Sequence, residues 1–292
     1  PAGWGRPPPR LRYGVLVSER RMALVLSGGG ARGAYEVGAV LGMAEGLASH
    51  GIEPRIDIFT GTSVGAINTV YLAAYDDLAE GARSLQKLWS GLRWADHLEI
   101  RAFETFKWLR GASRVDPSAT EMGPSIFNVS EIQRLIWEEV RWSELHRRVD
   151  AGDLRAVIIA ALHVGSGRTC LFGEFSPGWE YPVSRDPHRF LQAGRLAERH
   201  VLASAAIPAL FPAQRVDGDY YCDGGLRFNT PLAPALRSGA DALIVVNVAG
   251  DVEGGPINAK DNVEAYPSPG FLASRVLNAL MLDRVPQDLE AL

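Results

Sequence analysis

Apolar and polar residues follow a repeated strand-then-helix pattern in the first quarter of the chain. A short apolar run at residues 22–26 predicts a buried strand, and residues 56–59 predict a second one. Between them, apolar residues recur at spacings of three and four, which predicts a helix ending before Gly51. These residues are Val37, Val40, Leu41, Ala44 and Leu47. Residues 66–73 predict another helix, so the order is typical of a parallel sheet with right-handed crossovers.

Later apolar runs add further strands to the expected sheet. Residues 156–162 and 243–248 are short and rich in β-branched or small apolar residues, as in strands that are buried on both faces. Residues 215–222 predict a hairpin, with Asp217-Gly218 as its turn.

Three regions depart from this pattern and suggest a domain organisation. We expect a catalytic domain over residues 22–250, preceded by a Pro/Arg-rich segment at 1–21 that is a native leader or a remnant of cloning. Residues 89–142 hold five of the seven tryptophans and predict a helical insertion or cap over one end of the sheet. Residues 251–292 begin as a Gly/Pro-rich loop and continue as a helix at 271–282, which we expect to pack on the domain.

Composition and charge exclude several classes of protein. The hydrophobic fraction of 47% leaves ample material for a core, and a net charge of -4 argues against a nucleic-acid binder. The sequence contains no apolar run long enough for a transmembrane helix and no secretory signal pattern. Cys170 and Cys222 are too few for a disulfide framework. We therefore expect a cytoplasmic or membrane-peripheral protein, and the sequence predicts no oligomeric state.

A glycine cluster lies where the first strand meets the first helix. Its glycines are Gly28, Gly29, Gly30 and Gly33. Converging backbone N–H groups at a helix N-terminus bind an anion, which is either a stable phosphate or a transient oxyanion. The same run fits a dinucleotide motif, with Glu53 about twenty residues further on, so that interpretation stays open here. A tight turn that packs the helix against the strand is the structural alternative.

The second cluster surrounds Ser63, where the second strand gives way to a helix. Gly61 and Gly65 flank the serine in the pattern of a nucleophile elbow, a strained turn in which nearby side chains would clash. The N-terminus of the following helix favours negative charge developing at the serine. The alternative is that Ser63 merely caps this helix.

The third cluster is Asp223, which is followed by Gly224 and Gly225. An aspartate before two glycines is often a turn residue. Here it follows the predicted hairpin, at a strand end from which its carboxylate could reach Ser63. The nearby acids Asp217 and Asp219 are better explained as hairpin residues.

Together, and in this order, the three clusters resemble the patatin-like phospholipase family. Residues 203–208 (Ala-Ser-Ala-Ala-Ile-Pro), Phe211-Pro212 and residues 229–231 (Asn-Thr-Pro) strengthen the resemblance, which spans about residues 22–248. It implies a three-layer α/β/α sandwich with a central, mainly parallel sheet. It also implies a Ser-Asp dyad that hydrolyses fatty-acyl esters of phospholipids or related lipids through an acyl-enzyme, without metal or cofactor.

The resemblance assigns the site residue by residue. Ser63 is the expected nucleophile and Asp223 its base. Gly29, Gly30 and Arg32 lie around the expected oxyanion hole, and the amides from Gly28 to Gly33 would hold the oxyanion. The expected partner is a lipid substrate, with contact at a membrane surface as a further candidate interaction.

Other interpretations remain at this point. The six histidines are His50, His97, His146, His163, His188 and His200. None follows Asp223, so the order serine, acid, histidine cannot be completed with this acid, although another acid paired with His163 or His200 stays open. No two histidines have metal-ligand spacing. The rival functions are a dinucleotide-binding oxidoreductase and a non-catalytic lipid-binding protein.

Aromatic residues of the predicted insertion offer a candidate surface for lipid. They are Trp94, Phe103, Phe106 and Trp108, together with Leu109. An aromatic cap packed on the core explains the same residues equally well.

Overall fold

The protein is described by a computed structural model that covers residues 20–92, 99–100, 127–128, 130–184 and 186–248. Residues 1–19 of the predicted leader, the helix at 271–282 and the candidate lipid-facing aromatic residues lie outside this part of the chain. Within it, no helix is long and apolar enough to cross a bilayer.

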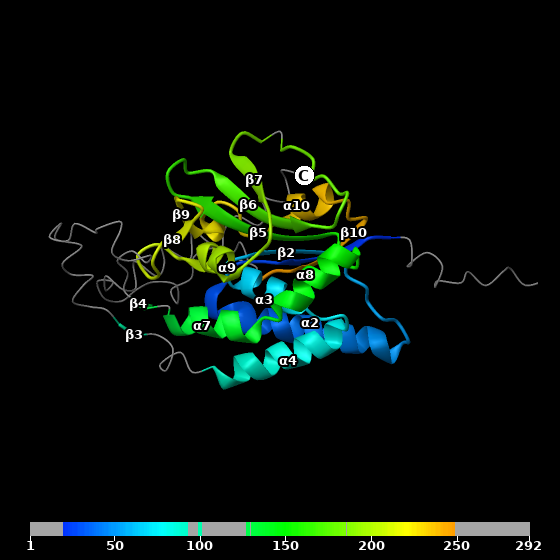
Figure 1. Cartoon of the computed structure of the whole chain (residues 1–292). Helices are drawn as coiled ribbons and strands as arrows, with labels where there is room; N and C mark the ends of the chain where they lie inside the picture. Colours follow the sequence, from blue (N-terminus) through cyan, green and yellow to red (C-terminus); the bar gives the residue numbers. More distant parts are fainter. Residues whose placement is uncertain (1–19, 93–98, 101–126, 129, 185, 249–292) are drawn as a thin grey trace, which may run out of the picture.

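An eight-stranded sheet forms the centre of the molecule (Figure 1). Its strands are β1 (Met22–Leu26), β2 (Ile58–Thr62), β5 (Ala156–His163), β6 (Thr169–Phe175), β7 (Arg189–Ala193), β8 (Gln214–Val216), β9 (Asp219–Asp223) and β10 (Ala242–Val246). The main order is β10-β1-β2-β5-β6-β7, in which β10, β1, β2 and β5 run parallel and β6 runs antiparallel to β5. Strand β9 pairs with both β5 and β8. A separate ladder joins β3 (Glu99–Ile100) to β4 (Phe127–Asn128).

Helices cover both faces of this sheet. They are α2 (Gly33–Ser49), α3 (Val64–Ala73), α4 (Leu78–Gly91), α7 (Ser130–Glu139), α8 (Trp142–Ala151), α9 (Glu198–Ala205) and α10 (Leu232–Arg237), with short 3-10 turns at Gly30–Arg32 and Gly224–Leu226. In Figure 1, α2, α3 and α4 lie below the sheet and α10 lies above it. The three-layer α/β/α class expected from the sequence is thereby confirmed.

The continuous apolar runs of the strands follow from burial on both faces. In β1, Leu24 and Leu26 belong to the apolar cluster that includes α2, α3 and α4. Ala23 and Val25 belong to the opposite cluster, which includes Leu232 of α10. Because successive strand side chains point to opposite faces, a strand between two helical layers needs apolar residues at every position.

The bounds of β2 and β10 differ from the sequence prediction. Strand β2 begins at Ile58 and continues to Thr62, beyond the expected end at residue 59. Its threonines are buried because their hydroxyls find backbone acceptors: Thr60 donates to Pro231 O and Thr62 to Phe228 O. An apolar pattern could not reveal partners about 170 residues away. Strand β10 spans Ala242–Val246 and so ends two residues before the expected position.

The hairpin prediction is confirmed. Strands β8 and β9 pair antiparallel, and the turn residues Asp217 and Gly218 have φ values of 50° and 98°. Positive φ at both central residues suits the right-handed twist of the flanking strands.

Candidate active site

Ser63 occupies a strained turn between β2 and α3, with φ 56° and ψ -125°. The turn packs directly beneath the end of β1, because a β-carbon added at Gly65 would lie 2.4 Å from the Leu26 carbonyl oxygen. A β-carbon at Gly61 would lie 2.4 Å from the Gly65 carbonyl oxygen. Larger residues at either glycine would therefore displace the turn. A non-glycine residue at positive φ costs on the order of 1 to 3 kcal/mol, and it persists only where its surroundings hold it.

Strand pairing brings Asp223 to this turn. Along one side of β5, β2 pairs up to Ala160, which lies opposite Thr62. Strand β9 takes the next position on the same side, with Asp223 opposite Ala161. The end of β2 and the end of β9 therefore meet beside β5, and the residue after Thr62 is Ser63.

The two side chains form a direct hydrogen bond in a buried setting. The Ser63 hydroxyl donates to Asp223 Oδ2 at 2.6 Å, and the Gly225 amide donates to Asp223 Oδ1 at 2.7 Å. Both Ser63 and Asp223 are buried. Burial raises the pKa of Asp223 to about 7, although the hydrogen bonds from Ser63 and Gly225 lower it. The carboxyl is thus a stronger base than an exposed aspartate. Gly224 lies close against β5, since an added β-carbon would be 2.3 Å from the Ala160 carbonyl oxygen.

The glycine loop precedes α2 and approaches Ser63. The Gly28 amide donates to Asn229 O, and the Gly33 amide to carbonyls of the loop itself. Among the described residues, the amides of Gly29 and Gly30 have no acceptor. Gly30 has φ 58°, which favours glycine, and it lines the same cavity as Ser63.

Arg32, also expected near the oxyanion hole, has its own interactions. Its amide donates to Gly29 O, and its guanidinium Nη1 donates to Val248 O at 3.2 Å. The side chain is exposed. These contacts tie the loop to the residues after β10.

A buried polar network lies behind the glycine loop, and the sequence analysis missed it. Glu36 is fully buried on α2 and accepts a hydrogen bond from Asn68 Nδ2 at 2.9 Å. Asn68 also donates to Gly33 O and accepts from Trp89 Nε1. Burial raises the pKa of Glu36 to about 8, although hydrogen bonds from Asn68 and Ser27 lower it. The available signal was an acid on the apolar face of a helix, four residues before Val40.

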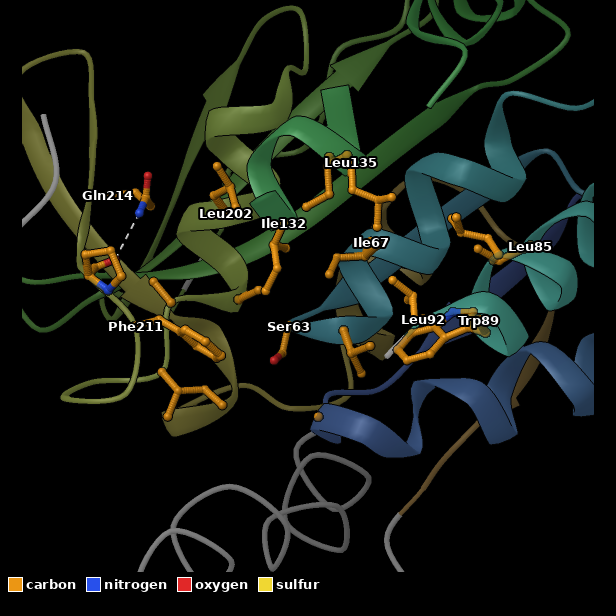
Figure 2. A pocket seen from close by; sticks show the side chains of 18 residues that line it. Ser63, Ile67, Leu85, Trp89, Leu92, Ile132, Leu135, Leu202, Phe211 and Gln214 are labelled. Atoms are coloured by element: carbon orange, nitrogen blue, oxygen red, sulfur yellow. Dashed lines mark hydrogen bonds between the residues drawn. The ribbon is translucent and has the colours of Figure 1, made fainter. Parts of the chain in front are cut away.

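An apolar cavity of about 110 Å³ opens at the serine. Figure 2 shows Ser63 between Phe211 on one side and Trp89 on the other. Helices α3, α4, α7 and α9 supply most of the remaining wall, and their side chains there are aliphatic; examples are Ile67, Leu85, Ile132, Leu135 and Leu202. The site therefore combines a buried Ser–Asp pair with space for a hydrocarbon group.

The histidines occupy other positions. His163 Nδ1 contacts the Ser166 hydroxyl, and His200 Nδ1 accepts from the Ala197 amide. Burial lowers the pKa of His200 to about 4. Among the described residues, no histidine is hydrogen-bonded to Ser63 or Asp223; His97 lies outside them.

The described residues offer neither a reactive cysteine nor a cluster of metal ligands. Cys170 and Cys222 are free and buried, and burial raises the pKa of the Cys222 thiol to about 11, so the thiol stays protonated at neutral pH. No group of three or more His, Cys, Asp or Glu side chains with metal-binding geometry occurs in the described ranges.

Comparison with known proteins identifies the family. The sequence pattern described as "Patatin-like phospholipase" matches residues 24–236. The chain belongs to this family. Glu53, the acid needed for the dinucleotide interpretation, precedes β2 in this fold instead of following it, and family membership removes the oxidoreductase alternative.

Two curated relatives and one solved structure are similar to this family member. It is 27% identical over 221 residues to a cGAMP-activated phospholipase from Pseudomonas aeruginosa, a match covering 71% of this chain and 53% of the relative. It is 23% identical over 257 residues to the lysophospholipase NTE1 of Meyerozyma guilliermondii, covering 88% of this chain and 14% of the relative. The crystal structure of VipD from Legionella pneumophila has a TM-score of 0.44 and 17% identity, covering 80% of this chain and 51% of that one. The chain thus spans about half or less of the length of these proteins.

Proposed function

We propose that this protein is a serine hydrolase that cleaves fatty-acyl esters of phospholipids or related lipids. The observation that carries the proposal is the 2.6 Å hydrogen bond from Ser63 to Asp223 at an apolar cavity. The relatives named as phospholipases add support for a lipid substrate. A binding protein without catalysis would have no use for a strained serine whose hydroxyl is bonded to a buried base.

In the proposed mechanism, Asp223 accepts the hydroxyl proton of Ser63 as Ser63 Oγ attacks the ester carbonyl carbon. The protonated carboxyl then delivers this proton to the departing alcohol or lysolipid, which leaves an acyl-enzyme. Asp223 next removes a proton from an incoming water, whose oxygen attacks the acyl carbon. The bond from Ser63 Oγ to the acyl carbon then breaks, the protonated Asp223 returns its proton to Ser63 Oγ, and the fatty acid leaves. A pKa of about 7 suits both directions of transfer near neutral pH.

The oxyanion hole is assigned within this proposal to the Gly29 and Gly30 amides. Both lack an acceptor among the described residues, whereas the Gly28 and Gly33 amides are already bonded. The proposed oxyanion hole therefore uses two amides, whereas the sequence led us to expect all the amides from Gly28 to Gly33. The residues after the loop begin α2, whose N-terminus adds positive potential.

Gly30→Ala is expected to lower kcat by roughly 10² to 10³, because a β-carbon disfavours the positive φ that sets the direction of the amide. Gly38→Ala is the matched control, since an added β-carbon meets no atom within 4 Å at either position. Gly38 lies inside α2, so its substitution is expected to preserve kcat and to maintain or raise the melting temperature. Equal kcat values for the two variants would remove Gly30 from the oxyanion hole.

The aliphatic walls of the cavity predict a preference for longer acyl chains. Each buried methylene contributes about 0.8 kcal/mol, so kcat/KM should rise along a series from acetyl to dodecanoyl esters. Leu135→Trp should fill part of the cavity and lower kcat/KM for the long esters on the order of tenfold, while leaving the acetyl ester unchanged.

Glu138→Trp provides the matched control, because Glu138 is exposed on the same helix and does not line the cavity. Its chain-length profile should equal that of the parent. The panel also includes intact phospholipids in vesicles. A flat profile in the parent would contradict the cavity as an acyl site, and absence of hydrolysis across the whole panel would contradict the proposed function.

A further inference from the structure

The C-terminal turn of α9 contacts both residues of the proposed dyad. Ser204 Oγ accepts a hydrogen bond from the Ser63 amide at 2.9 Å, and Ala206 O accepts one from the Asp223 amide at 2.9 Å. We propose that Ser204 is a positioning residue that holds the nucleophile in its strained conformation. This inference rests on the proposed function, since it assigns a role in the same reaction.

Ser204 joins three elements through a single hydroxyl. While its oxygen accepts from Ser63, its own proton is donated to the Ala160 carbonyl oxygen at 2.6 Å. A serine hydroxyl has one proton, so both of its directed interactions are determined. The residue is fully buried, and water cannot replace either partner. The elbow after β2 is thereby linked to β5 and α9.

The hydrogen bond to Ser204 matters because the backbone of Ser63 is strained. At φ 56° the conformation is unfavourable for serine and depends on surrounding contacts. The bond from the Ser63 amide to Ser204 fixes the orientation of the peptide unit that enters the turn. The bond from Asp223 to Ala206 fixes the other partner from the same turn of α9. The 2.6 Å contact between Ser63 Oγ and Asp223 therefore depends on how this turn is placed.

The same turn also forms a wall of the cavity, through Leu202, Ala205 and Ala206. A substrate acyl chain in the cavity would pack against residues on either side of Ser204. Ser204 thus connects the wall of the cavity, where the acyl chain would bind, to Ser63, which would attack the ester. Because the Ser63 amide is used in this link, it is unavailable to an oxyanion, which agrees with assigning that role to the glycine loop.

The test compares Ser204→Ala and Ser204→Cys with Ser238→Ala. Ser238 is the matched control: it is also fully buried and donates to one backbone carbonyl, Pro234 O at 2.9 Å, but it lies at the end of α10. Cysteine fills the γ position with a larger atom that bonds weakly, so a loss shared by both variants reflects lost hydrogen bonding and not an emptied site. The measurements are kcat and KM on a soluble ester, the rate constant of labelling by a fluorophosphonate probe, and the melting temperature.

For both Ser204 variants, kcat and the labelling rate constant are expected to fall roughly 10- to 100-fold, with KM within about threefold of the parent. The pH midpoint of activity should rise, because a displaced Ser63 hydroxyl no longer lowers the pKa of Asp223 through its hydrogen bond. Ser238→Ala should keep kcat even if it melts earlier. Should Ser204→Ala fail to fold, Ser204→Cys carries the comparison.

Retention of kcat within threefold in a folded Ser204 variant would overturn the positioning role. So would a rise in KM with unchanged kcat, which would show that Ser204 only shapes the cavity. A parent protein that neither hydrolyses esters nor labels at Ser63 would overturn the proposed function itself, and the positioning role with it.

Discussion

Ser63→Ala is expected to reduce ester hydrolysis about 10⁴- to 10⁶-fold while leaving the protein folded. The substitution removes the oxygen that we propose attacks the ester, together with the proton that is hydrogen-bonded to Asp223. Alanine keeps the β-carbon, so the close packing of the turn against β1 is preserved. The measurement is kcat/KM on a soluble acyl ester, together with the melting temperature.

Ser90→Ala, at an exposed position on α4, serves as the control and should behave as the parent does. More than about a tenth of the parent activity in purified, folded Ser63→Ala protein would exclude this serine as the nucleophile. Fluorophosphonate labelling should disappear in the same variant, which ties the lost activity to the lost hydroxyl.

Asp223→Asn should abolish hydrolysis by about 10⁴-fold or more, because an amide cannot accept the serine proton at neutral pH. Asparagine is isosteric, and its oxygen can still accept from the Gly225 amide. In contrast to the activity, the stability is expected to increase. The folded-state pKa of about 7 exceeds the ordinary 3.8, so the folded protein binds more protons than the unfolded chain between these values.

Stability of the parent is therefore lost as the pH rises from about 4 to about 7. Asp223→Asn removes this loss and should be more stable than the parent at pH 8 by on the order of 1 to 4 kcal/mol, with the difference shrinking toward pH 4. Denaturant unfolding of both proteins at pH 4, 6 and 8 measures it. A constant difference across these values would show that Asp223 titrates normally.

A panel of single His→Ala variants distinguishes the dyad from a triad. Each variant should retain turnover within about tenfold of the parent, because no described histidine is bonded to Ser63 or Asp223. The pH profile alone cannot make this distinction, since a pKa of about 7 for Asp223 falls where a histidine also titrates. One folded histidine variant as inactive as Ser63→Ala would show that a triad operates.

The alternating strands and helices, the glycine loop and the serine turn could be predicted because their signals are local. The two glycines that flank Ser63 at a strand-to-helix junction already indicate the close backbone approaches seen at Gly61 and Gly65. The proximity of Asp223 could be expected from its place at a strand end and from the family resemblance, but its exact position could not. In the fold it depends on which residue of β9 pairs with Ala161, and this register is not visible in the Asp-Gly-Gly sequence.

The pattern of apolar and polar positions could not predict hydrogen bonds between residues that are far apart in the sequence. Ser204 lies in a run of small residues whose sequence says nothing of an amide 141 positions earlier. Glu36 lies on the apolar face of its helix, but the sequence does not show that Asn68 lies against it as a hydrogen-bond partner. The extension of β2 through Thr60 and Thr62 has the same cause, since buried hydroxyls depend on acceptors supplied by another part of the chain.

The position of β9 beside β5, in line with β2, determines when hydrolytic activity can first appear during synthesis of the chain. Ser63 and Asp223 are separated by 160 positions, and Ala160, which anchors the elbow, lies between them in the sequence. A growing chain that ends before β8 contains Ser63 but not Asp223, its proposed base. Closing so long a loop is slow compared with local helix formation. Hydrolytic competence would thus arise in one late step, after synthesis has passed residue 223, and no lipid would be attacked by an unfinished molecule.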